Sequence, residues 1–274
     1  MRKYFSLTLL LVAVTTFVNG QTGHDNFKEG FLLRRLELAS SYAVSYLKAD
    51  NKEILKKDFQ NISYQNNNNE IETLIFSGFE SPELLVRFKF DSLPKATPLA
   101  TLTTKLELTS VESELIRLLA DATHKINSRY QGNFSPTTGT EFRAIPVVSN
   151  KQKKVFVYCQ PSKNFNYVLL GNDYELQYDS VLNFRSIRKY HKKENNVPLS
   201  SNQGMVTVHE HTTNDEISPT DVCSLLLNKE RIKWKQHIVL NPKYVAIFNL
   251  DKENSYILMM REEFDEVMKK QQRK

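Results

Sequence analysis

The chain has 274 residues, with 37 Lys and Arg against 31 Asp and Glu, so its formal net charge is +6. Its hydrophobic fraction of 40% and charged fraction of 25% are typical of a globular protein with one large or two small domains. The positive excess is mild and the two signs are interspersed, which excludes an argument from charge for a nucleic-acid partner.

The first 20 residues have the pattern of a cleavable secretory signal peptide. Arg2 and Lys3 precede an apolar stretch at residues 7–18, and small or modest side chains follow at residues 18–20. This stretch is short for a membrane span, which needs about 20 apolar residues; a retained anchor is the alternative interpretation. We predict a mature chain that begins at Gln21, carries a net charge of +4, has no transmembrane segment and is exported to the periplasm or the extracellular space.

The region before residue 132 is predicted to be helical and mixed. Apolar residues recur at helical spacing over residues 24–60, with a second helical piece at 52–59. The polar run at 65–69 predicts a loop, and strands are predicted at 71–79 and 84–90. Thr109 and Glu112 form a capping box for an amphipathic helix that ends near Tyr130.

The Gly-, Pro- and Ser-rich stretch at residues 131–139 is the predicted boundary between a region at 21–132 and an α+β domain at 140–274. The second region is predicted to contain mainly short strands, a helix from Pro219 that ends by Lys233, and a short terminal helix. The expected strands lie at 142–148, 155–159, 167–170, 174–178, 181–187, 205–211, 236–240, 244–250 and 256–260. The predicted fold class is therefore α+β.

Two of the six histidines, His209 and His211, are one residue apart in a predicted strand. Alternate side chains of a strand share a face, so both imidazoles are expected to point the same way. Two imidazoles can bind a divalent metal such as zinc when a carboxylate and a water complete a tetrahedral site. Asp221, ten positions after His211 at the start of a predicted helix, is the candidate carboxylate.

This arrangement resembles the JAMM metalloproteases, in which a His-x-His pair precedes a loop and a helix that begins with Ser-x-x-Asp. The resemblance covers residues 204–260, and it implies that His209, His211 and Asp221 bind zinc while Ser218 helps to stabilise a tetrahedral intermediate. It also implies a JAMM-like C-terminal fold and hydrolysis of a peptide or amide bond, in an extracytoplasmic protein or peptide, by metal-activated water.

The sequence departs from that family at three places, one of which is the loop between His211 and Ser218, about one residue shorter than is usual in the family. Thr212 stands where the family usually has proline, and the upstream glutamate that activates the water has no obvious counterpart. Glu141 and Glu175 are the candidates, and Glu141 is the one that we assign to this role. A non-catalytic JAMM-like interaction or envelope-associated structural module is the alternative, because a plain helix cap also explains residues 218–221.

The two cysteines, a basic run and the single tryptophan can each be explained by a structural role. Cys159 and Cys223 can either form a disulfide or lie as free thiols in the core. The basic run at residues 185–193, which includes His191, is interpreted as a solvated face. Trp234 is expected in the core rather than in a binding surface.

Overall fold

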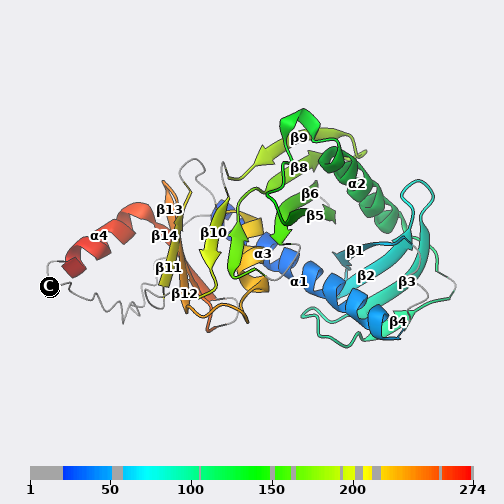
Figure 1. Ribbon diagram of the computed structural model, residues 1–274, viewed down its shortest axis with the longest axis horizontal. Coiled ribbons are helices and arrows are strands. Elements are labelled where there is room, and N and C mark those ends of the chain that lie inside the picture. Colours follow the sequence, from blue (N-terminus) through cyan, green and yellow to red (C-terminus); the bar gives the residue numbers. More distant parts are fainter. Residues whose placement is uncertain are drawn as a thin grey trace.

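The structure is a computed structural model that describes residues 21–50, 58–104, 106–148, 152–161, 165–191, 194–200, 206–211, 217–252 and 255–272. The predicted signal peptide at residues 1–20 lies outside these ranges. Within them, no helix is both long enough and apolar enough to span a membrane. Helices and antiparallel or mixed sheets alternate along the chain, which confirms the α+β fold class (Figure 1).

The first sheet follows the long N-terminal helix α1 (Gln21–Asp50) and is antiparallel in the order β1-β2-β3-β4. Its strands are β1 (Gln60–Gln65), β2 (Ile71–Ser77), β3 (Glu83–Phe90) and β4 (Ala100–Leu102). The prediction of a helix as far as residue 60 was wrong, because β1 begins there and pairs along its whole length with β2. Residues 51–57, which hold most of the predicted second helical piece, lie outside the described ranges.

The predicted capping box is confirmed at the start of α2 (Ser110–Asn127). The Thr109 hydroxyl accepts from the Glu112 amide at 3.2 Å, and the Glu112 carboxylate accepts from the Thr109 amide at 2.7 Å. Arg87 of β3 also donates to both Glu112 oxygens, at 2.7 and 2.8 Å. The fully buried Glu112 side chain therefore both caps α2 and attaches it to the first sheet.

The second half of the chain forms two four-stranded sheets, a two-stranded pair and two helices. The sheet β5-β6-β8-β9 is antiparallel, and β7 pairs with β10. In the sheet β11-β12-β13-β14 only β11 and β12 are parallel. The bounds are β5 (Thr140–Val148), β6 (Lys153–Pro161), β7 (Tyr167–Leu170), β8 (Tyr174–Tyr178), β9 (Phe184–Lys189), β10 (Asn195–Pro198), β11 (Val206–Glu210), α3 (Pro219–Leu227), β12 (Gln236–Leu240), β13 (Tyr244–Asn249), β14 (Ser255–Met260) and α4 (Arg261–Gln272).

The strand predicted at 181–187 begins later, at Phe184, because a turn occupies the preceding residues. The Asp179 carboxylate accepts from the amides of Val181 and Asn183, and Leu182 has a positive φ of 67°. The predicted helix after the His-x-His strand is present as α3. Residues 133–139 connect the end of the short turn after α2 to β5, and a domain division there stays a prediction.

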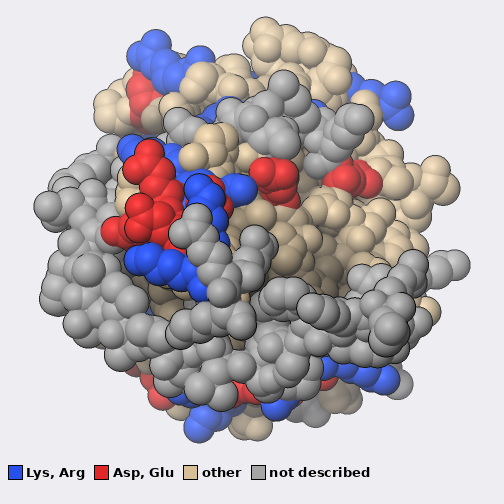
Figure 2. All heavy atoms as spheres, turned by 90° about the vertical axis from the view of Figure 1, so that its left-hand side faces the viewer, with Lys and Arg blue, Asp and Glu red and all other residues tan. Residues whose placement is uncertain are grey.

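The two cysteines are free and buried, so the disulfide alternative was wrong and the core interpretation is confirmed. Burial raises the pKa of the Cys159 thiol to about 12 and that of Cys223 well above its usual value. Trp234 is also buried, as predicted. Acidic and basic side chains lie next to one another on the face of the molecule shown in Figure 2, in agreement with the mild charge balance.

Helix α1 reaches from the first sheet to α3, and it packs closely against α3 (Figure 1). A Cβ atom on Gly30 would lie 2.4 Å from the Cβ of Val222 and 2.8 Å from the carbonyl oxygen of Pro219. Only glycine fits this approach. The Asn26 side-chain amide donates to the carbonyl of Ile217 at 3.0 Å and fixes the segment that leads into α3.

We predict that Gly30→Ala lowers the free energy of unfolding by about 1–2 kcal/mol, because overpacking against α3 outweighs the gain in helix propensity. Urea denaturation measures the change. Ser41→Ala, on the exposed side of α1, is the matched control and should stay within about 0.5 kcal/mol of the wild type. Equal stability of Gly30→Ala and Ser41→Ala would contradict the close helix contact.

Candidate metal centre

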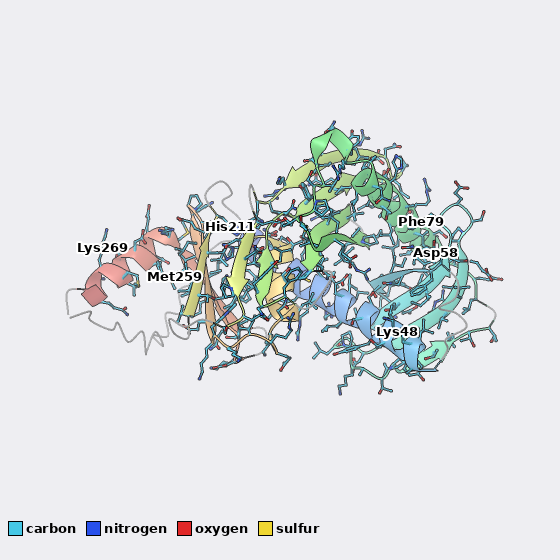
Figure 3. All side chains as sticks on the ribbon, in the orientation of Figure 1. Lys48, Asp58, Phe79, His211, Met259 and Lys269 are labelled. Atoms are coloured by element: carbon cyan, nitrogen blue, oxygen red, sulfur yellow. The ribbon has the colours of Figure 1, made fainter. Side chains whose placement is uncertain are left out.

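Three histidines and one aspartate bring their side chains together in the interior. His209 lies on β11 and His211 directly follows that strand, and each is 4% exposed, whereas Glu210 between them is exposed. This confirms that the two imidazoles share one face of the strand. Asp221, 1% exposed, lies in the first turn of α3, and His191 follows β9. Figure 3 shows His211 in the middle of the molecule, away from Lys48 and Lys269.

The donor atoms of these four residues converge. His211 Nε2 lies 2.8 Å from the Nε2 atoms of both His191 and His209. Asp221 Oδ2 lies 3.0 Å from His211 Nε2, 3.1 Å from His191 Nε2 and 3.3 Å from His209 Nε2. All four donor atoms lie within 4.8 Å of one another.

Hydrogen bonding alone does not account for this geometry. A ring nitrogen of histidine forms one hydrogen bond in the ring plane, yet His211 Nε2 has three polar neighbours at 3.0 Å or less. Ligands at about 2.0–2.1 Å from a tetrahedral metal are about 3.3 Å from one another, close to the five spacings of 2.8–3.3 Å given above. The group therefore faces a common point and can hold a metal ion.

The electrostatics of the group favour a cation at this point. Burial by itself raises the pKa of Asp221, but the charge of His191 and hydrogen bonds from three imidazoles hold it well below its usual value. Burial by itself lowers the pKa of His191, but the charges of Asp221 and Asp173 outweigh it and raise that pKa to about 11. Without a metal, a positive charge is thus held against a buried carboxylate.

A second layer of hydrogen bonds orients the rings. His209 Nδ1 lies 2.7 Å from His237 Nε2, and His237 Nδ1 lies 2.7 Å from the Thr207 hydroxyl. Burial lowers the pKa of both His209 and His237, so both rings are neutral. If His209 Nε2 is unprotonated, as metal binding requires, the proton of this neutral ring is on Nδ1. His209 Nδ1–H then donates to His237 Nε2, and His237 Nδ1–H donates to the Thr207 hydroxyl.

Asp173 orients the remaining histidine. Its Oδ1 accepts from His191 Nδ1 at 2.5 Å, and its Oδ2 accepts from the Ser218 hydroxyl at 2.6 Å and from Thr220. Asp173 is 1% exposed, so its carboxylate oxygens are shielded from solvent and interact with these partners. The same carboxylate therefore connects His191 with the start of α3, the helix that carries Asp221.

The sequence-predicted residues differ in their relation to this group. Ser218 is the N-cap of α3, since its hydroxyl accepts from the Thr220 and Asp221 amides, which confirms the capping interpretation. Glu141 is exposed on β5, paired with Gln160, and is not one of the four converging residues. Glu175 is buried on β8 and accepts from Tyr190 at 2.6 Å.

His191 is the donor that the sequence analysis missed. It was assigned to a solvated basic run, and Arg185 and Lys189 of that run are indeed exposed. His191 itself is only 8% exposed, because the chain turns inward after β9 at Tyr190. Local charge pattern gave no sign of this change; the only available signal was a third histidine 18 residues before the His-x-His pair.

No family model, curated protein or solved structure matches the chain. The resemblance to JAMM metalloproteases thus stays a prediction from the sequence motif at residues 204–260.

We predict that His237→Leu weakens the binding of an added divalent metal by about 10–100-fold, because His209 loses the acceptor that orients its ring. His237→Gln should retain most of the affinity, since its amide oxygen can accept from His209 and its NH₂ can donate to Thr207. Competition with a chromophoric chelator measures both constants. Equal affinities for the Leu and Gln variants would contradict the hydrogen-bond chain.

Proposed function

We propose that this chain is an exported zinc protein whose metal centre consists of His191, His209, His211 and Asp221. The convergence of four buried donors carries the proposal. A set of three imidazoles and one carboxylate suits zinc, whereas magnesium and calcium prefer shells of oxygen ligands. The leader-like pattern of residues 1–20 supports export.

The proposed activity is hydrolysis of a peptide or amide bond in an extracytoplasmic protein or peptide. Support comes from the JAMM-like order of β11, α3, β12 and β13 around His209, His211 and Asp221. Bound zinc would supply a water of lowered pKa as the nucleophile. Ser218, whose buried hydroxyl lies at the head of the helix that carries Asp221, is the proposed helper for the developing oxyanion, a role in which its O–H would turn from Asp173 to the oxyanion. Glu141, which is exposed on β5 and is not one of the four converging residues, stays a prediction as the base that activates this water.

A specific observation favours a second candidate, a non-catalytic module with a structural zinc. All four donors are protein groups and none is more than 8% exposed. Closed, four-ligand sites are typical of zinc that stabilises a fold, whereas catalytic sites keep one position for water. The two candidates share the metal and differ in whether a water can reach it.

We predict about one equivalent of zinc per chain in the mature protein, purified from the exported fraction and with an intact mass that begins at Gln21. Elemental analysis measures the metal. His209→Ala should lose zinc, because it removes one of the four donors, whereas His124→Ala, which changes an exposed histidine on α2, should keep it. A metal-free wild type that does not take up added zinc would end the proposal.

We predict that zinc-loaded protein cleaves members of a degenerate synthetic peptide library, and that Asp221→Asn, with weakened metal binding, does not. Mass spectrometry of the library detects the new termini, and His124→Ala is the control that should cleave like the wild type. Full zinc occupancy together with no cleavage by the wild type or by His191→Ala would favour the structural module.

A further inference from the structure

We propose that His191 is a fourth, exchangeable ligand that closes the metal centre at rest, so that water reaches the metal only when His191 leaves. This inference rests on the proposed zinc centre and concerns its regulation. The other three donors all lie within the segment at residues 209–221, whereas His191 comes from the end of the β5-β6-β8-β9 sheet.

The position of His191 distinguishes a ligand from a neighbour of a bound water. Its Nε2 lies 2.8 Å from His211 Nε2 and 3.1 Å from Asp221 Oδ2. A ring that donated to or accepted from a metal-bound water would lie one hydrogen bond farther out, roughly 4 Å or more from the other ligands. The observed spacings are those of two groups that share one metal.

The attachment of His191 allows it to leave without disturbing the other ligands. Its Nδ1 is held by Asp173, and the Tyr190 amide donates to the Asp173 carbonyl at 3.1 Å. The Tyr190 hydroxyl donates to Glu175 of β8 at 2.6 Å. These contacts belong to the β8–β9 side of the site, whereas His209 and His211 are fixed by the pairing of β11 with β12.

Asp173 is the point at which the two sides meet, because it also accepts from Ser218 and Thr220 of α3. Rotation of the His191 side chain away from the other donors breaks its hydrogen bond to Asp173 Oδ1 and leaves the contacts of Ser218 and Thr220 with Asp173 Oδ2 intact. Zinc would then keep His209, His211 and Asp221 and gain an open position, the coordination of a catalytic rather than a structural site.

Cobalt-substituted protein tests the proposal, with azide as a small anion that binds only to an open position. The visible bands of wild-type protein should be insensitive to azide, whereas those of His191→Ala should shift, with at least tenfold tighter azide binding. His124→Ala is the matched control and should behave like the wild type.

Three other results would contradict the proposal. Azide binding to the wild type as tight as to His191→Ala would show that the fourth position is already open and would overturn the proposal. Loss of cobalt from His191→Ala would show that the ligand is indispensable and would overturn its exchange. If neither wild type nor variant takes up cobalt or zinc, the proposed zinc centre itself fails.

Discussion

The interior of this protein must accommodate a buried carboxylate surrounded by three imidazoles. Asp221 is 1% exposed, and removal of an ion from water costs several kcal/mol unless opposite charge and hydrogen bonds compensate. His191, His209 and His211 all lie within 3.3 Å of one Asp221 oxygen. The charge of His191 compensates this carboxylate, and a bound metal ion would supply a positive charge shared by all four groups.

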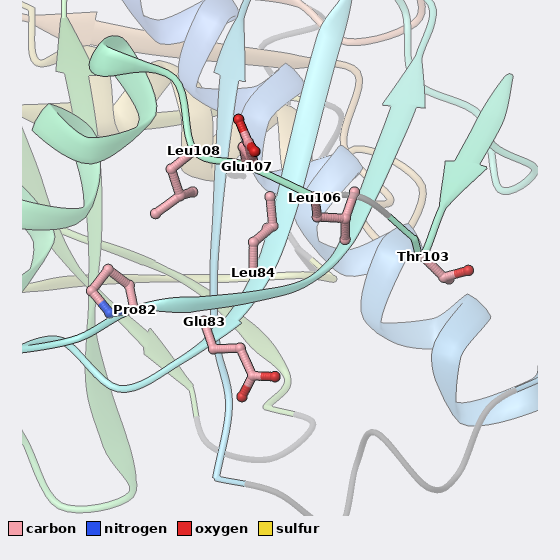
Figure 4. Close-up of a pocket in the computed structure, with 7 residues that line it drawn as sticks. All are labelled: Pro82, Glu83, Leu84, Thr103, Leu106, Glu107 and Leu108. Atoms are coloured by element: carbon pink, nitrogen blue, oxygen red, sulfur yellow. The ribbon is translucent and has the colours of Figure 1, made fainter.

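The rest of the fold serves to place these four donors. Gly30 lets α1 approach α3 closely enough to hold the helix start at which Asp221 lies. Parallel pairing of β11 with β12 sets His209 beside His237, which orients it. The cavity between the start of β3 and residues 103–108, lined by Leu84, Leu106 and Leu108, shares no residue with the metal group (Figure 4).

Rules based on the spacing of residues along the sequence predicted the parts of the structure that depend on near neighbours in the chain. The capping box of Thr109 and Glu112 and the shared face of His209 and His211 follow from spacing alone. These rules did not predict the long-range contacts: β1 is defined by its partner β2, and His191 belongs to the site through its contacts with His211 and Asp221. The orienting roles of Asp173 and His237 likewise depend on residues 18 or more positions away.

X-ray absorption at the zinc edge of the loaded wild-type protein tests the central claim most directly, because it counts the imidazoles around the metal. The proposed centre predicts three imidazole nitrogens and one carboxylate oxygen at about 2.0–2.1 Å, without sulfur. A shell of two or fewer imidazoles completed by water oxygens, or a sulfur ligand at about 2.3 Å, would contradict a centre made of His191, His209, His211 and Asp221.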